Sequence, residues 1–256
     1  MNDPHVECLR YLLELGATLA ISDAPPLDHE TDHFTIRLEA GKLTVSMKEH
    51  HPSLESAQKR VAPFLRSWER DNDLRYGPPA LRFAYEDCLV IDRNPPPSGS
   101  PHTILAAGVV SFSAVGIAAR GVVGLRKYPP PPASFKATRD VEALWYHYES
   151  HLEGKERLSD MGHFCLTLVR GLGGGNDGAA DMFQISAPVL RKLGDLTTNR
   201  GDEKTARKYM PRPRPYHPQE ETWIKEVVRA LIRRVGEHAA GAPLKKLTMA
   251  DFPPVP

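Results

Sequence analysis

Four consecutive prolines, residues 129–132, limit the architecture of this chain more than any other segment. Proline fixes its own φ angle and has no amide hydrogen, so such a run favours an extended polyproline II segment. Apolar residues before the run mostly alternate with polar ones, whereas those after it recur about every 3.6 residues. The prolines therefore predict a boundary between a strand-rich region and a helical region.

The expected fold class is α+β, with a β-rich domain that includes one or two helices, followed by a C-terminal helical bundle. The 256 residues, 41% of them hydrophobic, are enough to give each part a core of its own. The predicted divisions are a β-rich α+β domain over 1–128, a proline-rich boundary over 129–135 and a helical domain over 136–256.

Residues 4–17 are expected to form a short helix, because apolar side chains recur there at helical spacing. The other elements expected in the N-terminal part are a hairpin over 33–49, a helix over 53–77 opened by Ser53, and one or two strands over 80–93. Helices in the C-terminal part are expected over 139–154, 159–172, 186–196 and 217–241.

Residues 103–119 carry no charge, which raises the alternative of a membrane-spanning helix. Their glycine, alanine, serine and valine content instead favours buried strands with glycine bends. The N-terminus lacks the basic start of a secretion signal, and the three cysteines have no metal or disulfide spacing. These features predict a soluble, cytoplasmic protein with buried, reduced cysteines and no membrane association.

Charge is unevenly distributed, although the net charge is only +1. Residues 1–57 hold ten acidic and four basic side chains, whereas residues 191–246 hold fourteen basic and seven acidic ones. Cations on phosphates release counterions, and tyrosines stack on unpaired bases, so a basic segment with tyrosines indicates a nucleic-acid contact. The predicted contact residues, called the basic surface below, are Arg200, Lys204, Arg207, Lys208, Tyr209, Arg212, Arg214, Arg229 and Arg233.

An alternative for the basic surface is that its charges are neutralised within the protein. The nearby carboxylates are Asp202, Glu203, Glu220 and Glu221, and the acidic N-terminal half offers others. Both readings are compatible with the sequence, and an acidic protein partner would use the same cations.

Residues 29–33 read His-Glu-Thr-Asp-His, which matches the H-E-x-x-H pattern of zinc peptidases. That chemistry needs a helix, which places both histidines on one face with the glutamate beside the bound water. Here two prolines precede the motif and a strand-like segment follows it, so an exposed acidic loop is expected instead. We expect no metal site and no cofactor.

A second histidine pair, His147 and His151, has the i, i+4 spacing on a convincing helix. Two histidines supply only half of a zinc site, although His163 on the next helix offers a third ligand. The expected arrangement is a solvated helix face. A metal-dependent hydrolase that uses the histidine pairs is the weakest of the functional alternatives.

Four segments together resemble an uncharacterised family of bacterial proteins without an established activity. They are residues 125–135 (LRKYPPPPASF), 141–169 (VEALWYHYESHLEGKERLSDMGHFCLTLV), 196–208 (LTTNRGDEKTARK) and 230–240 (ALIRRVGEHAA). The helical half is also similar to HEPN-type helical domains, whose ribonucleases carry an Arg and a His with four to six residues between them. Arg233 and His238 fit that spacing, but Arg234 replaces the usual polar residue after the arginine.

The HEPN resemblance implies a ribonuclease in which His238 acts as acid or base and Arg233 stabilises the transition state. Positions i and i+5 lie about 140° apart on a straight helix, so this needs a helix break near Gly236 or a dimer. The function expected first is therefore a non-enzymatic interaction module, in which the basic surface contacts nucleic acid or an acidic protein partner.

Overall fold

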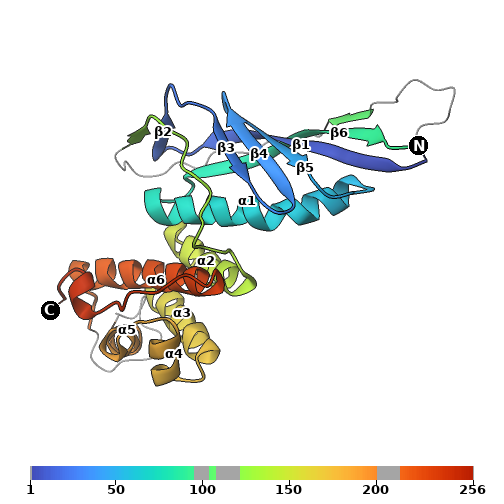
Figure 1. The fold of residues 1–256 in the computed structure, drawn as a ribbon. Coiled ribbons are helices and arrows are strands. Elements are labelled where there is room, and N and C mark those ends of the chain that lie inside the picture. Colours follow the sequence, from blue (N-terminus) through green and yellow to red (C-terminus); the bar gives the residue numbers. More distant parts are fainter. Residues whose placement is uncertain (1, 95–103, 108–121, 201–213, 256) are drawn as a thin grey trace. The chain divides into compact units, whose positions relative to one another are not determined.

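The computed structural model describes residues 2–94, 104–107, 122–200 and 214–255. The chain divides into two compact units, Met1–Pro132 and Ala133–Pro256, called here the sheet unit and the helical unit. This division falls inside the proline-rich segment 129–135. The fold class is α+β, as predicted, with the described strands in the first unit and most helices in the second (Figure 1).

The described strands of the sheet unit form a six-stranded antiparallel sheet with the order β3-β4-β5-β1-β6-β7. A separate parallel pair joins β2 to β8. The predicted hairpin over 33–49 is present as β4 and β5. The strands are β1 (Pro4–Leu15), β2 (Leu19–Ile21), β3 (Leu27–Glu30), β4 (Phe34–Glu39), β5 (Lys42–Met47), β6 (Leu81–Asp92), β7 (Ile104–Ala107) and β8 (Val123–Leu125).

Strand β1 corrects the helix predicted over residues 4–17. It lies between β5 and β6, so both of its edges are hydrogen-bonded, and buried residues occur on both of its faces. Leu9 and Tyr11 join the core on one face, while Cys8 on the opposite face is also buried. A bulge between Val6 and Cys8 shifts the register and gives the apolar residues a spacing that resembles a helical period.

Helix α1 (Leu54–Tyr76) runs along one face of the sheet (Figure 1). The Ser53 hydroxyl accepts a hydrogen bond from the amide of Ser56, which confirms the predicted N-cap. Pro63 lies on the exposed side of the helix, which continues through it. The α1 side chains that enter the core with the strands are Ala57, Val61, Leu65 and Trp68.

The end of α1 is tied to β6 by buried carboxylates. The Asp73 side chain accepts hydrogen bonds from the Ala80 amide at 2.8 Å and from the Arg82 guanidinium at 2.9 Å. The Glu69 carboxylate accepts one from the Phe83 amide at 2.9 Å, and burial raises the pKa of Glu69. These bonds satisfy backbone amides where β6 begins, and they fix the strand against the helix.

The start of the proline run belongs to the sheet unit. The buried Trp68 indole donates a hydrogen bond of 2.9 Å to the carbonyl oxygen of Pro129. The Gly41 amide, in the β4–β5 turn, donates one of 3.0 Å to the Tyr128 hydroxyl. Tyr128 and Pro129 therefore belong with the sheet unit, since they contact the β4–β5 turn and α1.

Within its described residues, the helical unit contains all four helices predicted for it and two further short ones. Trp145 and Trp223 lie at its centre and are almost completely buried. Gly236 packs so closely on the Phe135 ring that a Cβ there would overlap it. The helices are α2 (Arg139–Leu152), α3 (Leu158–Leu172), α4 (Asn176–Met182), α5 (Ala187–Asn199), α6 (Pro218–Ala239) and the short 3-10 helix η1 (Met249–Asp251).

Two further predictions concern apolar residues. The three cysteines, Cys8, Cys88 and Cys165, are buried and unpaired with one another, as expected. Of the uncharged segment 103–119, residues 104–107 form β7, and the rest lies outside the described residues. Among the described helices, none has the length and apolar character needed to cross a bilayer.

Candidate functional site

The structure describes only part of the basic surface. Five of its members lie within 201–213, outside the described residues: Lys204, Arg207, Lys208, Tyr209 and Arg212. The described members are Arg200 at the end of α5, Arg214 just before α6, and Arg229 and Arg233 on α6. The described cations therefore flank the undescribed segment on both sides in the sequence.

Two of these arginines form ion pairs inside the helical unit. Arg200 lies 2.9 Å from the Glu220 carboxylate, which is almost completely buried. Glu220 also accepts a hydrogen bond of 3.0 Å from the His217 amide, so it caps the start of α6. Arg229 pairs with Glu226 one helical turn away at 3.0 Å. Arg200 thus compensates a buried charge, which is a structural task.

Arg214 is exposed, and it lies close in sequence to an anchored tyrosine. The Tyr216 hydroxyl donates a hydrogen bond of 3.1 Å to the Leu196 carbonyl oxygen, and burial raises the pKa of Tyr216 to about 12. Tyr216 therefore fixes the chain between the undescribed segment and α6, so that Arg214 projects from an anchored backbone.

Arg233 and His238, the residues of the HEPN resemblance, lie on different sides of α6. The helix runs without interruption from Pro218 to Ala239, so Gly236 does not break it. Five residues of regular helix separate the two side chains by about 140°. His238 is exposed and contacts the Phe183 ring, with ring centroids 5.4 Å apart. Within one helical unit, the structure does not bring this pair together.

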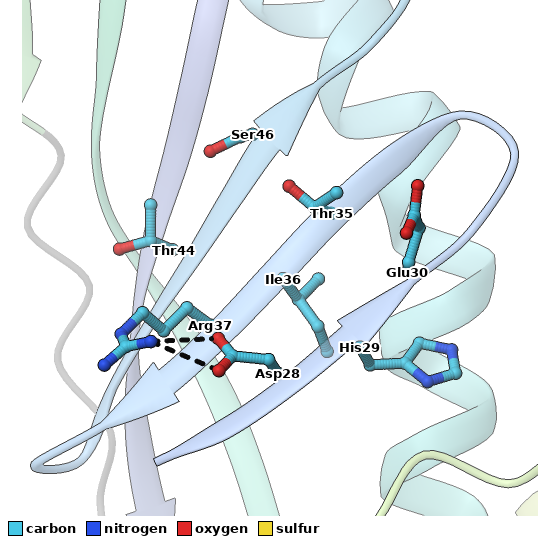
Figure 2. Close-up of a pocket in the computed structure, with 8 residues that line it drawn as sticks. All are labelled: Asp28, His29, Glu30, Thr35, Ile36, Arg37, Thr44 and Ser46. Atoms are coloured by element: carbon cyan, nitrogen blue, oxygen red, sulfur yellow. Dashed lines mark hydrogen bonds and ion pairs between the residues drawn. The ribbon is translucent and has the colours of Figure 1, made fainter.

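The H-E-x-x-H segment is part of the sheet, where an exposed loop was predicted. His29 and Glu30 belong to the edge strand β3, which pairs with β4, and residues 31–33 form the turn between them. In Figure 2, His29 and Glu30 project in different directions from the strand. The His33 ring instead lies 2.7 Å from Glu49. A strand and a turn cannot reproduce the helical geometry of zinc peptidases.

The same strands border an open hollow of about 570 Å³ on the sheet face opposite α1 (Figure 2). Its polar side chains follow from the register. Asp28 faces Arg37, Arg37 faces Thr44, and Thr44 faces Arg10 on β1. Arg37 donates to both oxygens of Asp28 at 3.2 Å. Two arginines, each held by an aspartate, thus flank one threonine on this face.

The second row of the hollow consists of Glu30, Thr35 and Ser46. Figure 2 shows the hydroxyls of Thr35, Thr44 and Ser46 on the same side of the sheet. Such a face suits a polar ligand, but its charges are balanced and its shape is open. The alternation of residues 34–47 in the sequence indicates which of their side chains share this face of the hairpin. The pairing of β3 and β1 with the hairpin cannot be predicted from that alternation.

Several acidic side chains of the sheet unit are paired with cations of that unit. Glu30 lies 2.5 Å from Lys48, Arg37 pairs with Asp28 and Glu39, and Glu49 lies 3.5 Å from Arg60. The remaining basic residues of 1–57 pair with later carboxylates, Arg10 with Asp87 and Lys42 with Glu86. Exposed pairs add little stability, but they do offset charge locally.

Two histidines near the start of β1 are buried. The His5 ring is fully buried, and its Nδ1 accepts a hydrogen bond of 3.2 Å from the His51 amide. Its Nε2 lies 3.4 Å from the Glu7 carboxylate, outside hydrogen-bond geometry. Burial lowers the pKa of both His5 and His51. These rings are therefore neutral at pH 7.

The histidine pair of α2 is held by one residue. His147 Nδ1 lies 2.8 Å from both carboxylate oxygens of Glu156, and His151 Nδ1 lies 3.0 Å from the Glu156 carbonyl oxygen. His163 instead lies 3.3 Å from the Thr167 hydroxyl, so it does not complete the pair. Throughout the part of the chain that the structure describes, no three His, Cys, Asp or Glu side chains gather as metal ligands would.

Comparison of the chain with protein-family models, with curated proteins and with solved structures gave no match. The resemblance to bacterial and HEPN-type proteins therefore stays a sequence-based expectation.

Proposed function

We propose that this protein is a non-enzymatic interaction module and that its helical unit contacts single-stranded nucleic acid through the basic surface. The observation that carries the proposal is the distribution of ion pairs. In the sheet unit, Asp28 and Glu39 pair with Arg37 and Glu30 pairs with Lys48, whereas residues 191–246 carry fourteen basic side chains against seven acidic ones. Such an excess suits a polyanion.

Residue types in this segment favour nucleic acid over an acidic protein. The segment 204–214 interleaves Tyr209 with arginines and lysines, and tyrosine offers a flat surface on which an unpaired base stacks. Arginine adds bidentate contacts to phosphate. Arg200 is not counted among the contacts, because it already compensates the buried Glu220.

The ribonuclease alternative receives less support from the geometry. Arg233 and His238 project from different sides of an uninterrupted helix, so one helical unit would not present both to the same phosphodiester. Binding without cleavage is therefore the form of the proposal that agrees best with α6.

The test is a titration of the full chain against a fluorescein-labelled single-stranded RNA of about 20 nucleotides, read by fluorescence anisotropy at several salt concentrations. Each phosphate contact on a single strand contributes about −0.7 to the slope of log K against log salt, so four to six contacts predict about −3 to −4. The variant Arg207→Glu with Lys208→Glu should weaken binding at least about tenfold and flatten this slope.

The matched control is Lys59→Glu with Arg60→Glu, which makes the same change in net charge on the exposed side of α1. This control should bind RNA nearly as well as the unaltered chain. Equal losses in both double variants would refute the basic surface as the contact. Binding of poly-glutamate in place of RNA would refute the nucleic-acid form and support an acidic protein partner.

A further inference from the structure

The hydrogen bonds of His147 and His151 determine which ring nitrogen carries the proton. A backbone carbonyl only accepts, so the Nδ1 of His151 must be protonated to bond to the Glu156 carbonyl oxygen at 3.0 Å. The Glu156 carboxylate likewise requires a proton on the Nδ1 of His147, which lies 2.8 Å away. In the neutral form of the side chain, each ring therefore keeps a lone pair on Nε2.

Neither Nε2 atom has a hydrogen-bond partner among the described residues. Neither atom is fully buried, so solvent reaches both of them. The two residues are spaced i, i+4 on the regular helix α2, which places them on the same side, one turn apart. Two histidines at this spacing on one helix can bind a single ion together.

The rings are also held in orientation. The His147 ring stacks on Phe164 of α3, with ring centroids 3.6 Å apart. Glu156 bonds both Nδ1 atoms, one through its side chain and the other through its backbone. Protein metal sites commonly hold a ligating histidine in this way, by a carboxylate or a carbonyl on the second nitrogen. One residue here supplies both kinds of support.

We propose that His147 and His151 bind a divalent transition-metal cation such as Zn²⁺ through their Nε2 atoms, with Glu156 as the positioning residue for both rings. Neutral imidazole suits Zn²⁺, Cu²⁺ and Ni²⁺ better than Mg²⁺ or Ca²⁺. No third protein ligand joins the pair among the described residues, so water or an added ligand fills the remaining positions. The proposal does not depend on RNA binding.

Charges around the pair are compatible with a cation. His151 interacts electrostatically with the negative charges of Glu156 and Glu221 and with the positive charge of Lys225 of α6. An anionic ligand in an open position would offset part of the charge of a divalent ion.

The experiment is isothermal titration of ZnCl₂ into the untagged, chelator-treated full chain, with nitrogen NMR of the histidine rings on the same sample. We expect saturable binding of one ion, with Nε2 signals of two histidines shifted and their Nδ1 protons retained. His147→Ala and His151→Ala should each abolish this binding. Glu156→Gln, which keeps an acceptor for the ring, should weaken binding about 10–100-fold.

The matched control is His29→Ala with His33→Ala, which removes the H-E-x-x-H histidines and should leave the affinity unchanged. Absence of saturable binding in the unaltered chain would overturn the proposal. So would binding that survives His147→Ala, or an NMR shift confined to histidines other than this pair. The NMR readout uses the unaltered protein, so the test stands even where a variant folds poorly.

Discussion

The carboxylate of Asp73 offers the sharpest test of how the sheet unit is held together. Its side chain is fully buried, and it accepts from the Ala80 amide at 2.8 Å, from Arg82 at 2.9 Å and from Arg70 at 3.1 Å. Asp73→Ala removes the acceptor of all three groups. Arg70 is itself buried, so the variant leaves a cation in a poorly hydrated place without this partner.

Breaking a buried ion pair from one side typically costs about 3–5 kcal/mol, and we expect a loss in that range for the free energy of unfolding. With a urea dependence of about 2 kcal/mol per molar, the unfolding midpoint should fall by about 1.5–2.5 M. Asp73→Asn keeps an acceptor for the Ala80 amide but loses the charge, so an intermediate loss is expected.

Hydrogen exchange with mass spectrometry at increasing urea is the suitable assay, because peptides from α1 and β6 report the sheet unit separately from the helical unit. Asp28→Ala is the matched control, since it removes an aspartate whose pair with Arg37 is exposed on both sides. It should cost no more than about 1 kcal/mol. Equal midpoint shifts for Asp73→Ala and Asp28→Ala would show that the buried network contributes no more than a surface pair.

Three other predictions follow from single contacts. Arg200→Ala should destabilise the helical unit by about 1–3 kcal/mol, because it leaves the buried Glu220 carboxylate unpaired. Arg229→Ala, at a more exposed pair, should cost under about 1 kcal/mol. Equal losses in thermal unfolding would contradict this prediction. Gly236→Ala should lower the free energy of unfolding by about 1–3 kcal/mol, because its methyl group would overlap Phe135. Gly171→Ala, which has open space around it, should leave that free energy unchanged or raise it by up to about 1 kcal/mol. Burial lowers the folded-state pKa of His5 and His51 below 6.5, so the unfolded chain takes up protons first as the pH falls through 6.5. The free energy of unfolding should therefore drop there and stay level above pH 7. His5→Leu with His51→Leu should flatten that drop in urea titrations, and an unchanged profile would assign it to other groups.

Local patterns predicted most of the elements. The Ser53 cap, the β4–β5 hairpin and the long helix α6 each carry a strong signal within a single segment, and each is present. Residues 4–15 show where such reasoning fails, because a leucine-rich central strand with a bulge has nearly the same apolar spacing as a helix. These residues form a strand because they pair with β5 and β6, which are distant in the sequence.

The candidate site residues show the same division between local and distant information. The i, i+4 spacing of His147 and His151 is visible in the sequence, but the role of Glu156 depends on how the α2–α3 turn folds back. The row from Asp28 through Arg37 and Thr44 to Arg10 needs the register of four strands. The sequence offers Glu220 as one of four carboxylates near the basic residues, and the structure identifies it as the partner of Arg200.

The bonds from Trp68 to Pro129 and from Gly41 to Tyr128 bear on how the two halves of this chain can be separated or exchanged. A cut after Tyr128, where the composition changes, would strip a buried indole of its acceptor, at a cost of about 1–3 kcal/mol. A cut after Pro132 keeps both anchors with the sheet. Recombination that joined this sheet to a different domain would therefore have to keep Tyr128 and Pro129 with the sheet.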